Sequence, residues 1–146
     1  MRTSRPGKKI IGRIEKIDFP GWKLYNLDAK IDTGAFTSSL HCHYIKLSEN
    51  KKQVFFSILD PTHPEYEDST FRCSVMDIRP VKSSNGLSEE RIVIRSKIVL
   101  AGSLYPIELS LTDRTEMRNP VLIGRKFIRK KFIVDVSKKY AGAGDG

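Results

Sequence analysis

Cysteine is scarce in this chain of 146 residues, which contains only Cys42 and Cys73. Two thiols cannot build the framework of several disulfides that stabilises many small secreted domains. Their separation in the sequence also matches no zinc-binding knuckle. We expect both side chains to act as small apolar groups in the core, and the sequence also allows a single bond between them.

Long hydrophobic runs are absent as well. The apolar stretches are short, such as Ile92–Ile94, whereas a membrane-spanning helix needs about 20 apolar residues. The basic N-terminus, residues 1–9, is followed by a strand-like pattern and not by the apolar core of a signal peptide. We therefore expect a cytoplasmic protein that makes no contact with a membrane.

Acidic residues are outnumbered, with 17 Asp and Glu against 26 Lys and Arg, which gives a formal net charge of +9. Such an excess favours an anionic partner, for example an acidic peptide or a ribonucleoprotein. The basic residues are densest over 125–131, but no signature of a nucleic-acid-binding module accompanies them, so we do not expect nucleic acid to be a partner. The segment instead predicts a short helix with a solvated basic face and with Phe127, Ile128 and Phe132 turned inward.

Short strand patterns, in contrast, are abundant. Turn signals such as Pro20-Gly21 separate apolar or alternating segments. The predicted strands are 9–17, 24–31, 39–47, 54–59, 71–78, 91–100, 105–111, 120–124 and 132–136, with one short helix before the last. This spacing predicts a single closed or sandwiched β domain over residues 8–138, with flexible tails at 1–7 and 139–146.

One short motif carries recognisable chemistry. Asp32-Thr33-Gly34-Ala35 follows an apolar strand, so the carboxylate is expected where that strand leaves the sheet. An acid-protease site needs a carboxylate, a small hydroxyl residue that hydrogen-bonds to a partner copy, and a glycine that lets the backbone approach closely. Taken alone, the tripeptide indicates an ordinary turn, because Asp and Gly are common turn residues.

A second segment favours the chemical interpretation. Ala29–Ala35 together with Pro120–Ile128 resembles the retropepsin-like aspartic proteases, in which an apolar-apolar-glycine strand and a short helix pass behind the Asp-Thr-Gly loop. The resemblance implies a mainly β fold, a closed β-barrel of the acid-protease type with one short C-terminal helix. It also implies that Asp32 is catalytic, supported by Thr33, Gly34, Ala35, Ile123, Gly124 and Arg125.

A bacterial family labelled ATP-dependent zinc protease is similar over more of the chain, roughly residues 8–137. The matching motifs are 30–40, 90–94 and 107–125. Two departures stand out. The interval from Asp32 to Gly124 is 92 positions, longer than in the compact retroviral enzymes, so we expect an insertion near residues 60–70. Phe36 replaces a residue that is usually polar or charged, which leaves the partner of Arg125 unidentified.

The implied mechanism requires two carboxylates that share a proton, one of which activates a water. Because the chain has a single Asp-Thr-Gly, the second Asp32 must come from another copy, and we expect a homodimer. The predicted activity is hydrolysis of peptide bonds in a peptide or protein, with no cofactor. The family's association with ATP-grasp ligases that add glutamates to ribosomal proteins implies acidic peptide tails as substrates.

Further predictions concern two charged residues and the flap of the proposed site. Glu108 and Arg114 lie in or beside apolar strands, where they either line the cleft or form a structural ion pair. The flap that closes over substrate is predicted as a hairpin, either at 83–87 or at 101–103.

The family label raises the question of zinc. His41 and His43 alternate along a predicted strand, so both imidazoles could lie on one face and bind a metal with a third ligand such as His63. Their spacing matches no standard zinc site, and there is no Gly-rich phosphate loop, so we expect neither a catalytic zinc nor an ATP site. A zinc-dependent peptidase and a non-catalytic basic β domain that binds an anionic protein or ribonucleoprotein remain as alternatives.

Overall fold

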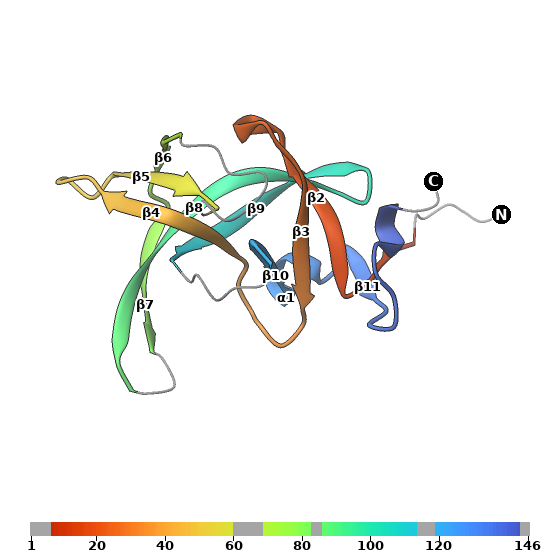
Figure 1. The fold of residues 1–146 in the computed structure, drawn as a ribbon. Coiled ribbons are helices and arrows are strands. Elements are labelled where there is room, and N and C mark those ends of the chain that lie inside the picture. The colour runs from red at the N-terminus through yellow and green to blue at the C-terminus, as the bar shows by residue number, and fades with distance from the viewer. Residues whose placement is uncertain (1–6, 60–68, 83–85, 114–118, 144–146) are drawn as a thin grey trace.

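The computed structural model describes residues 7–59, 69–82, 86–113 and 119–143, and this part of the chain is mainly β (Figure 1). The strands are β1 (Lys9–Ile11), β2 (Ile14–Phe19), β3 (Leu24–Asp32), β4 (Ser39–Leu47), β5 (Gln53–Ile58), β6 (Phe71–Ser74), β7 (Asp77–Lys82), β8 (Ser88–Leu100), β9 (Ser103–Thr112), β10 (Val121–Gly124) and β11 (Phe132–Val134). The helices are η1 (Pro20–Trp22), α1 (Arg125–Ile128) and η2 (Ala141–Ala143). The predicted mainly β architecture with one late α-helix is confirmed.

Two predicted strands are each divided in two in the structure. The strand predicted over 9–17 is divided into β1 and β2, because the Glu15 carboxylate turns back and accepts a hydrogen bond from the Gly12 N–H at 2.6 Å. The strand predicted over 71–78 is also two strands, and they have different neighbours. β6 pairs with β5, whereas β7 pairs with β8. Because β6 and β7 are separate strands, residues 77–82 lie beside β8 and not beside β5.

The strands of the large sheet form a closed circuit of pairings. The hydrogen-bonded order runs from β10 through β3, β2, β8 and β9 to β4, and β4 pairs in turn with β10. The β10–β3 and β4–β9 pairs are parallel, which brings the C-terminal strand β10 beside the end of β3. The β4–β5 and β7–β8 hairpins project beyond this circuit (Figure 1).

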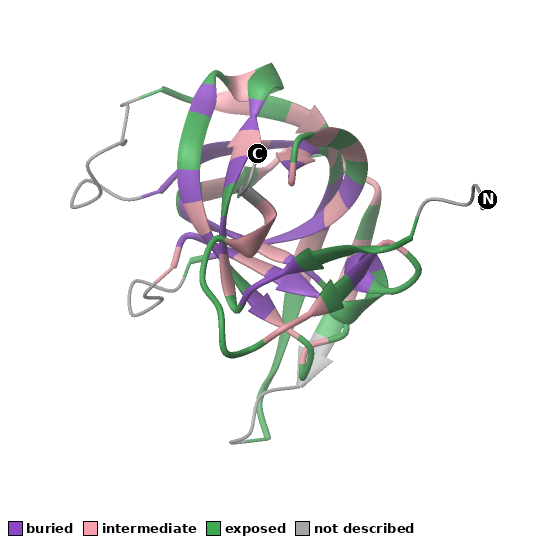
Figure 2. Cartoon of the chain, turned by 90° about the vertical axis from the view of Figure 1, so that its right-hand side faces the viewer, coloured by how far each residue is buried: buried purple, intermediate pink, exposed green. Residues whose placement is uncertain are grey.

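Apolar side chains fill the inside of the circuit. Along β3 the buried residues Leu27, Ala29 and Ile31 alternate with more exposed neighbours, the two-residue period of a strand with one face in the core. Phe19 and Ile123 are fully buried against the same cluster, and Figure 2 shows buried segments along several of the strands. Each such side chain contributes about 2 kcal/mol to folding relative to exposure. This core fixes the position at which β3 ends.

The C-terminal helix packs as predicted from its sequence. Phe127, Ile128 and Phe132 are buried, and the rings of Phe127 and Phe132 both contact Tyr105 with centroids 5.6 Å away. Beyond the helix, β11 pairs with β1 in parallel register. The helix is therefore anchored from its apolar side, with Arg125 and Lys126 left exposed.

Part of the segment predicted as a C-terminal tail is packed against the fold. The Gly142 N–H donates to the buried Glu15 carboxylate at 3.0 Å, and the Tyr140 hydroxyl donates to Asp28 at 3.0 Å. Ordered packing thus continues past residue 138, while residues 1–6 and 144–146 lie outside the described chain. In the part of the chain that is described, no helix has the length and apolar character needed to cross a membrane.

Candidate active site

The Asp-Thr-Gly turn begins where β3 ends. The Gly34 N–H donates to the Asp32 carboxylate at 2.9 Å, and the Ala35 N–H donates to the Asp32 carbonyl at 3.2 Å. A side chain at position 34 would bring its Cβ within 3.2 Å of the same carboxylate oxygen, so glycine permits the close approach. Asp32 is half-buried, and Thr33 is exposed. The turn orients the carboxylate and leaves it accessible at the surface of the single chain.

Strand β10 passes directly beside the turn. Its register places Ile123 opposite Ile31 and Gly124 opposite Asp32. The Gly124 N–H donates to the hydroxyl of Ser38 at 3.0 Å, and Ser38 is itself buried. The predicted pairing of the apolar-apolar-glycine strand with the Asp-Thr-Gly loop is therefore present in the structure.

The start of α1 holds the same loop from behind. The Arg125 N–H donates to the Ala35 carbonyl at 2.8 Å, and the Lys126 N–H donates to the Phe36 carbonyl at 3.0 Å. The first N–H groups of any helix lack partners within the helix, and here the loop satisfies two of them. The loop and the helix consequently position each other.

The side chain of Arg125 has an aromatic partner. Its guanidinium donates to the Thr33 carbonyl at 3.3 Å and lies 5.4 Å from the centre of the Phe36 ring. A guanidinium at this distance from an aromatic face is stabilised by a cation–π interaction. Phe36, the residue that departs from the family pattern, thus supplies the contact that the sequence left unidentified.

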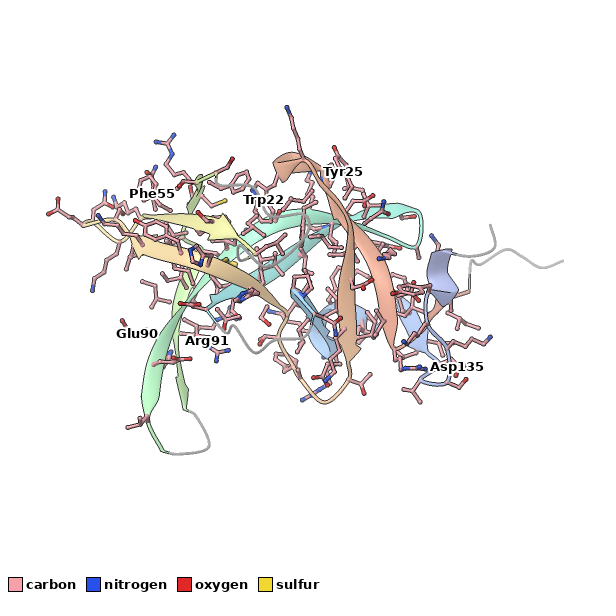
Figure 3. All side chains as sticks on the ribbon, viewed as in Figure 1. Trp22, Tyr25, Phe55, Glu90, Arg91 and Asp135 are labelled. Atoms are coloured by element: carbon pink, nitrogen blue, oxygen red, sulfur yellow. The ribbon has the colours of Figure 1, made fainter. Side chains whose placement is uncertain are left out.

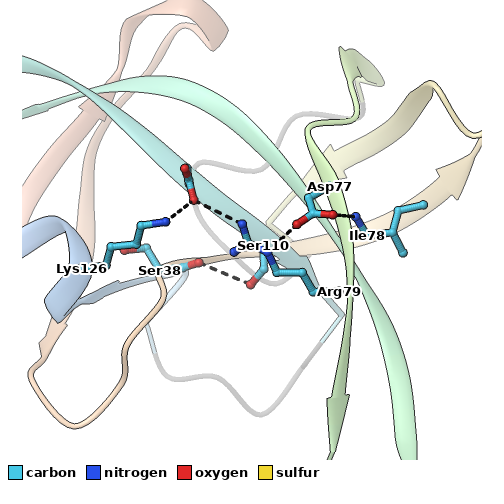
Figure 4. A network of polar contacts seen from close by, with 7 residues as sticks. Ser38, Asp77, Ile78, Arg79, Ser110 and Lys126 are labelled. Carbon is cyan, nitrogen blue, oxygen red and sulfur yellow. Dashed lines mark hydrogen bonds and ion pairs between the residues drawn. The ribbon is translucent and has the colours of Figure 1, made fainter.

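Glu108 lies in a network of charged side chains beside α1 (Figure 4). Its carboxylate accepts a hydrogen bond from Lys126 at 2.9 Å and lies 3.7 Å from the guanidinium of Arg79. Arg79 also contacts the carboxylate of Asp77 at 2.8 Å. The hydrogen bond from Lys126 is the main reason that the pKa of Glu108 is lowered from its ordinary value. Three elements, β7, β9 and α1, are joined through this one carboxylate.

The network lines a pocket of about 330 Å³, whose wall includes Glu108, Arg79 and Lys126. Glu108 therefore both lines a pocket and forms an ion pair, with Lys126 as its partner. Its predicted companion, Arg114, lies outside the described residues. Arg79 was not a candidate from the sequence, because the division between β6 and β7 that brings it to the pocket was not predicted.

The two candidate flap hairpins lie in different places. The hairpin of β7 and β8 contributes Arg79, Pro80 and Arg91 to the pocket wall, although residues 83–85 at its tip lie outside the described chain. The turn at 101–103 is instead tied to the other end of the molecule, where the Lys9 ammonium donates to the Ala101 carbonyl at 2.8 Å.

The two candidate metal-binding histidines do not share an environment. A β-bulge lies between Cys42 and Tyr44, and it breaks the two-residue alternation on which the prediction of a common face depended. His41 is 3% exposed, whereas His43 is exposed. The structure thus places the two imidazoles in different environments, one in the core and one in solvent. Among the described residues, no group of three His, Cys, Asp or Glu side chains could hold a metal ion.

Both cysteines are free thiols. Cys42 is fully buried, and burial strongly raises the pKa of its thiol. Cys73 is partly buried, and desolvation raises its pKa as well. These pKa values keep both sulfurs protonated at neutral pH, consistent with the predicted role as small apolar side chains.

Comparison with solved structures identifies a close relative of the fold. A Legionella pneumophila protein of unknown function, described as DUF785, superimposes with a TM-score of 0.73 at 26% sequence identity. The alignment covers 93% of this chain and 99% of the Legionella chain. The two proteins therefore share the fold over nearly their whole lengths.

Curated relatives are larger proteins. A protein of Shewanella pealeana named probable alpha-L-glutamate ligase is 37% identical over 137 residues, which cover 91% of this chain and 30% of the relative. A protein of the same name from Parasynechococcus marenigrum is 34% identical over 132 residues, 88% of this chain and 28% of the relative. The chain thus spans about a third of the length of these relatives.

A family model matches almost the entire described chain. It is the model of the RimB-like family, described as retropepsin-like aspartic endopeptidase RimB, and it matches residues 10–143. The matched range contains the Asp-Thr-Gly turn, the strand β10 beside it and helix α1. The chain belongs to the RimB-like family of retropepsin-like domains.

Proposed function

We propose that the protein is an aspartic peptidase in which Asp32 residues from two copies form the catalytic pair. The observation that carries this proposal is the support of Asp32 itself. Its carboxylate accepts the Gly34 N–H at the accessible end of β3, while Gly124 and α1 hold the loop from behind. A plain turn would not need a dedicated strand and helix to position it.

The chemistry follows from two carboxylates that share one proton. The ionised carboxylate takes a proton from a water as the water oxygen attacks the carbonyl carbon of the peptide bond. The protonated carboxyl group donates to the carbonyl oxygen, and the resulting tetrahedral species collapses when the amine nitrogen receives a proton. No cofactor is required for these steps.

A second copy is required because one chain supplies one such aspartate. Thr33 and Gly34 are exposed in the single chain, and Phe36 beside them is 46% exposed. A two-fold axis close to this loop would bring the two Asp32 side chains together and cover the exposed ring. The closed circuit of strand pairings supports the barrel of the acid-protease type. The β7–β8 hairpin is the better candidate for the flap, because its base lines the pocket beside α1.

Acidic peptide tails are the proposed substrates. The net charge of +9 favours anionic peptides. The curated relatives carry a name that refers to glutamate ligation, and their additional length lies outside the segment that matches this chain. We therefore apply only the association with glutamate, and not the ligase activity, to this protein.

The proposal is tested with Asp32→Asn in a peptide-library cleavage assay that includes glutamate-rich peptides. Asparagine keeps the shape but cannot accept the proton from water, so cleavage should fall about a thousandfold or more. Glu49→Gln, which removes an exposed carboxylate from the β4–β5 turn, is the matched control and should keep full activity. Cleavage that survives Asp32→Asn and is lost with a chelator would contradict the proposal and favour a zinc-dependent peptidase.

A further inference from the structure

The pocket beside α1 is distinct in its charge. It has a volume of about 330 Å³, at the lower end of the range for ligand sites, which suits one or two side chains of a peptide. Four cationic side chains and one carboxylate line it. The cations are Arg79, Arg91, Lys126 and Lys131, and the carboxylate is Glu108. The wall therefore presents an excess of positive charge.

The cations are only partly neutralised by their neighbours. Among the described residues, Lys131 contacts a neutral carbonyl and an aromatic ring: it donates to the Phe127 carbonyl at 3.2 Å and lies 4.8 Å from the centre of the Phe127 ring. Arg91, which Figure 3 labels, is paired at 3.0 Å with Glu89, a carboxylate that is itself 61% exposed. Exposed pairs of this kind contribute little energy and exchange partners readily.

Glu108 occupies the position that a ligand carboxylate would take. It lies between Lys126 at 2.9 Å and Arg79 at 3.7 Å, cations that belong to α1 and β7. Figure 4 labels these two cations, Lys126 and Arg79. Its side chain is 29% exposed, so water and an incoming anion can reach it. A second carboxylate can share or replace the contacts that Glu108 makes.

The pocket wall and the candidate active site include residues of the same chain segment. Thr37 and Ser38 line its wall and belong to the same β3–β4 connection as the Asp-Thr-Gly turn. Lys126 also donates its backbone N–H to Phe36 in that connection. A peptide that reaches from Asp32 along this connection would therefore pass beside the cations.

From this geometry we infer that the pocket is a subsite for a carboxylate side chain of an acidic peptide. Arg79, Lys126 and Lys131 determine its specificity. Glu108 is an internal carboxylate that occupies Lys126 when no peptide is bound and shares Arg79 with Asp77. The inference rests on the proposed function for its substrate, but binding at this subsite does not require cleavage.

Binding is measured in the full-length Asp32→Asn protein by isothermal titration calorimetry with penta-glutamate and penta-glutamine peptides. Penta-glutamate should bind, and penta-glutamine should bind at least about tenfold more weakly, because it lacks the charges that the cations recognise. Lys126→Met and Lys131→Met should each weaken penta-glutamate binding about five- to tenfold. Glu108→Gln should strengthen penta-glutamate binding, since the neutral amide leaves Lys126 available to the peptide.

Lys52→Met is the matched control, because Lys52 is an exposed lysine of the β4–β5 turn. It removes the same charge and should change binding by less than about twofold. Equal losses in Lys52→Met, Lys126→Met and Lys131→Met would overturn the subsite and indicate only a general attraction. Equal binding of the two peptides, tighter binding of inorganic phosphate than of penta-glutamate, or weaker binding in Glu108→Gln would also overturn it.

The two proposals fail in different ways. If the binding pattern is found but the wild-type protein cleaves no peptide, the peptidase proposal fails and the subsite stands. If the protein cleaves peptides through Asp32 but neither Lys126→Met nor Lys131→Met weakens penta-glutamate binding, the subsite fails and the peptidase proposal stands.

Discussion

Gly124 shows how a single residue connects the strand β10 to the candidate catalytic loop. A Cβ at this position would lie 2.7 Å from the Thr37 carbonyl carbon and 2.8 Å from the Phe36 carbonyl carbon. Both are backbone atoms, which cannot move aside without displacing the loop. Glycine is required here because two backbone segments of the chain are in contact, and not because of an unusual backbone angle.

We expect Gly124→Ala to lower the free energy of unfolding by about 2–3 kcal/mol and to reduce cleavage, because the displaced loop carries Asp32. Urea unfolding measures the first effect and the peptide assay the second. Gly21→Ala is the control, since nothing lies within 4 Å of a Cβ at Gly21, and its stability should change by less than about 0.5 kcal/mol. Equal stability of the two variants would contradict the close contact.

The sequence identified the residues that belong to recognisable motifs and missed the side-chain contacts between distant segments. Asp32 and Gly124 could be found because their two motifs together resemble those of a known family, although neither motif is decisive alone. The hydroxyl of Ser38 and the ring of Phe36 could not be assigned, because their partners Gly124 and Arg125 are more than 80 residues away in the chain. The different environments of His41 and His43 were not predicted, because the register shift between them carries no sequence signal of its own.

At the scale of elements, the strand boundaries were predicted best where the apolar alternation is unbroken. The prediction 39–47 coincides with β4, and 24–31 differs from β3 by one residue. The errors occur at Gly12 and between β6 and β7, where a strand ends because its next backbone groups have other partners. The Gly12 N–H is bound by Glu15, and the Met76 N–H donates to the Val93 carbonyl at 2.8 Å.

The link between β9 and α1 through Glu108 and Lys126 should depend on pH. The pKa of Glu108 is lowered in the folded protein from an ordinary value of 4.5. A lowered pKa means that the ion pair stabilises the fold above the ordinary value, and that this contribution is lost as the pH falls through the lowered value. Because both side chains are partly exposed, the contribution is at most about 1 kcal/mol.

The expected result is that wild type is more stable than Glu108→Gln at neutral pH, and that the difference shrinks below about pH 4.5 and disappears in stronger acid. Urea unfolding across this pH range measures it. In a Lys126→Met background, the pH-dependent difference in stability caused by Glu108→Gln should be smaller, because only Arg79 and Arg95 then lower the pKa of Glu108. A difference between wild type and Glu108→Gln that grows in acid would contradict the direction of the pKa shift.

At the scale of the whole molecule, the closed circuit of strands leaves the Asp-Thr-Gly turn at an accessible edge. The fold of the single chain is complete in its core, since the largest apolar side chains are buried without any partner. The single chain supplies one Asp32 carboxylate, and the proposed mechanism needs a second one from another copy. The core is therefore formed within one chain, whereas the proposed catalytic pair depends on association.

The most direct test of this central claim is the cleavage activity of wild-type protein refolded together with equal amounts of the Asp32→Asn variant. If each site needs Asp32 from both subunits, random association leaves a quarter of the dimers with two aspartates, and activity per wild-type subunit should fall to about half. A larger excess of the variant should reduce it further toward zero. Activity per wild-type subunit that stays constant at every mixing ratio would show that one chain suffices, and would contradict the shared aspartate pair.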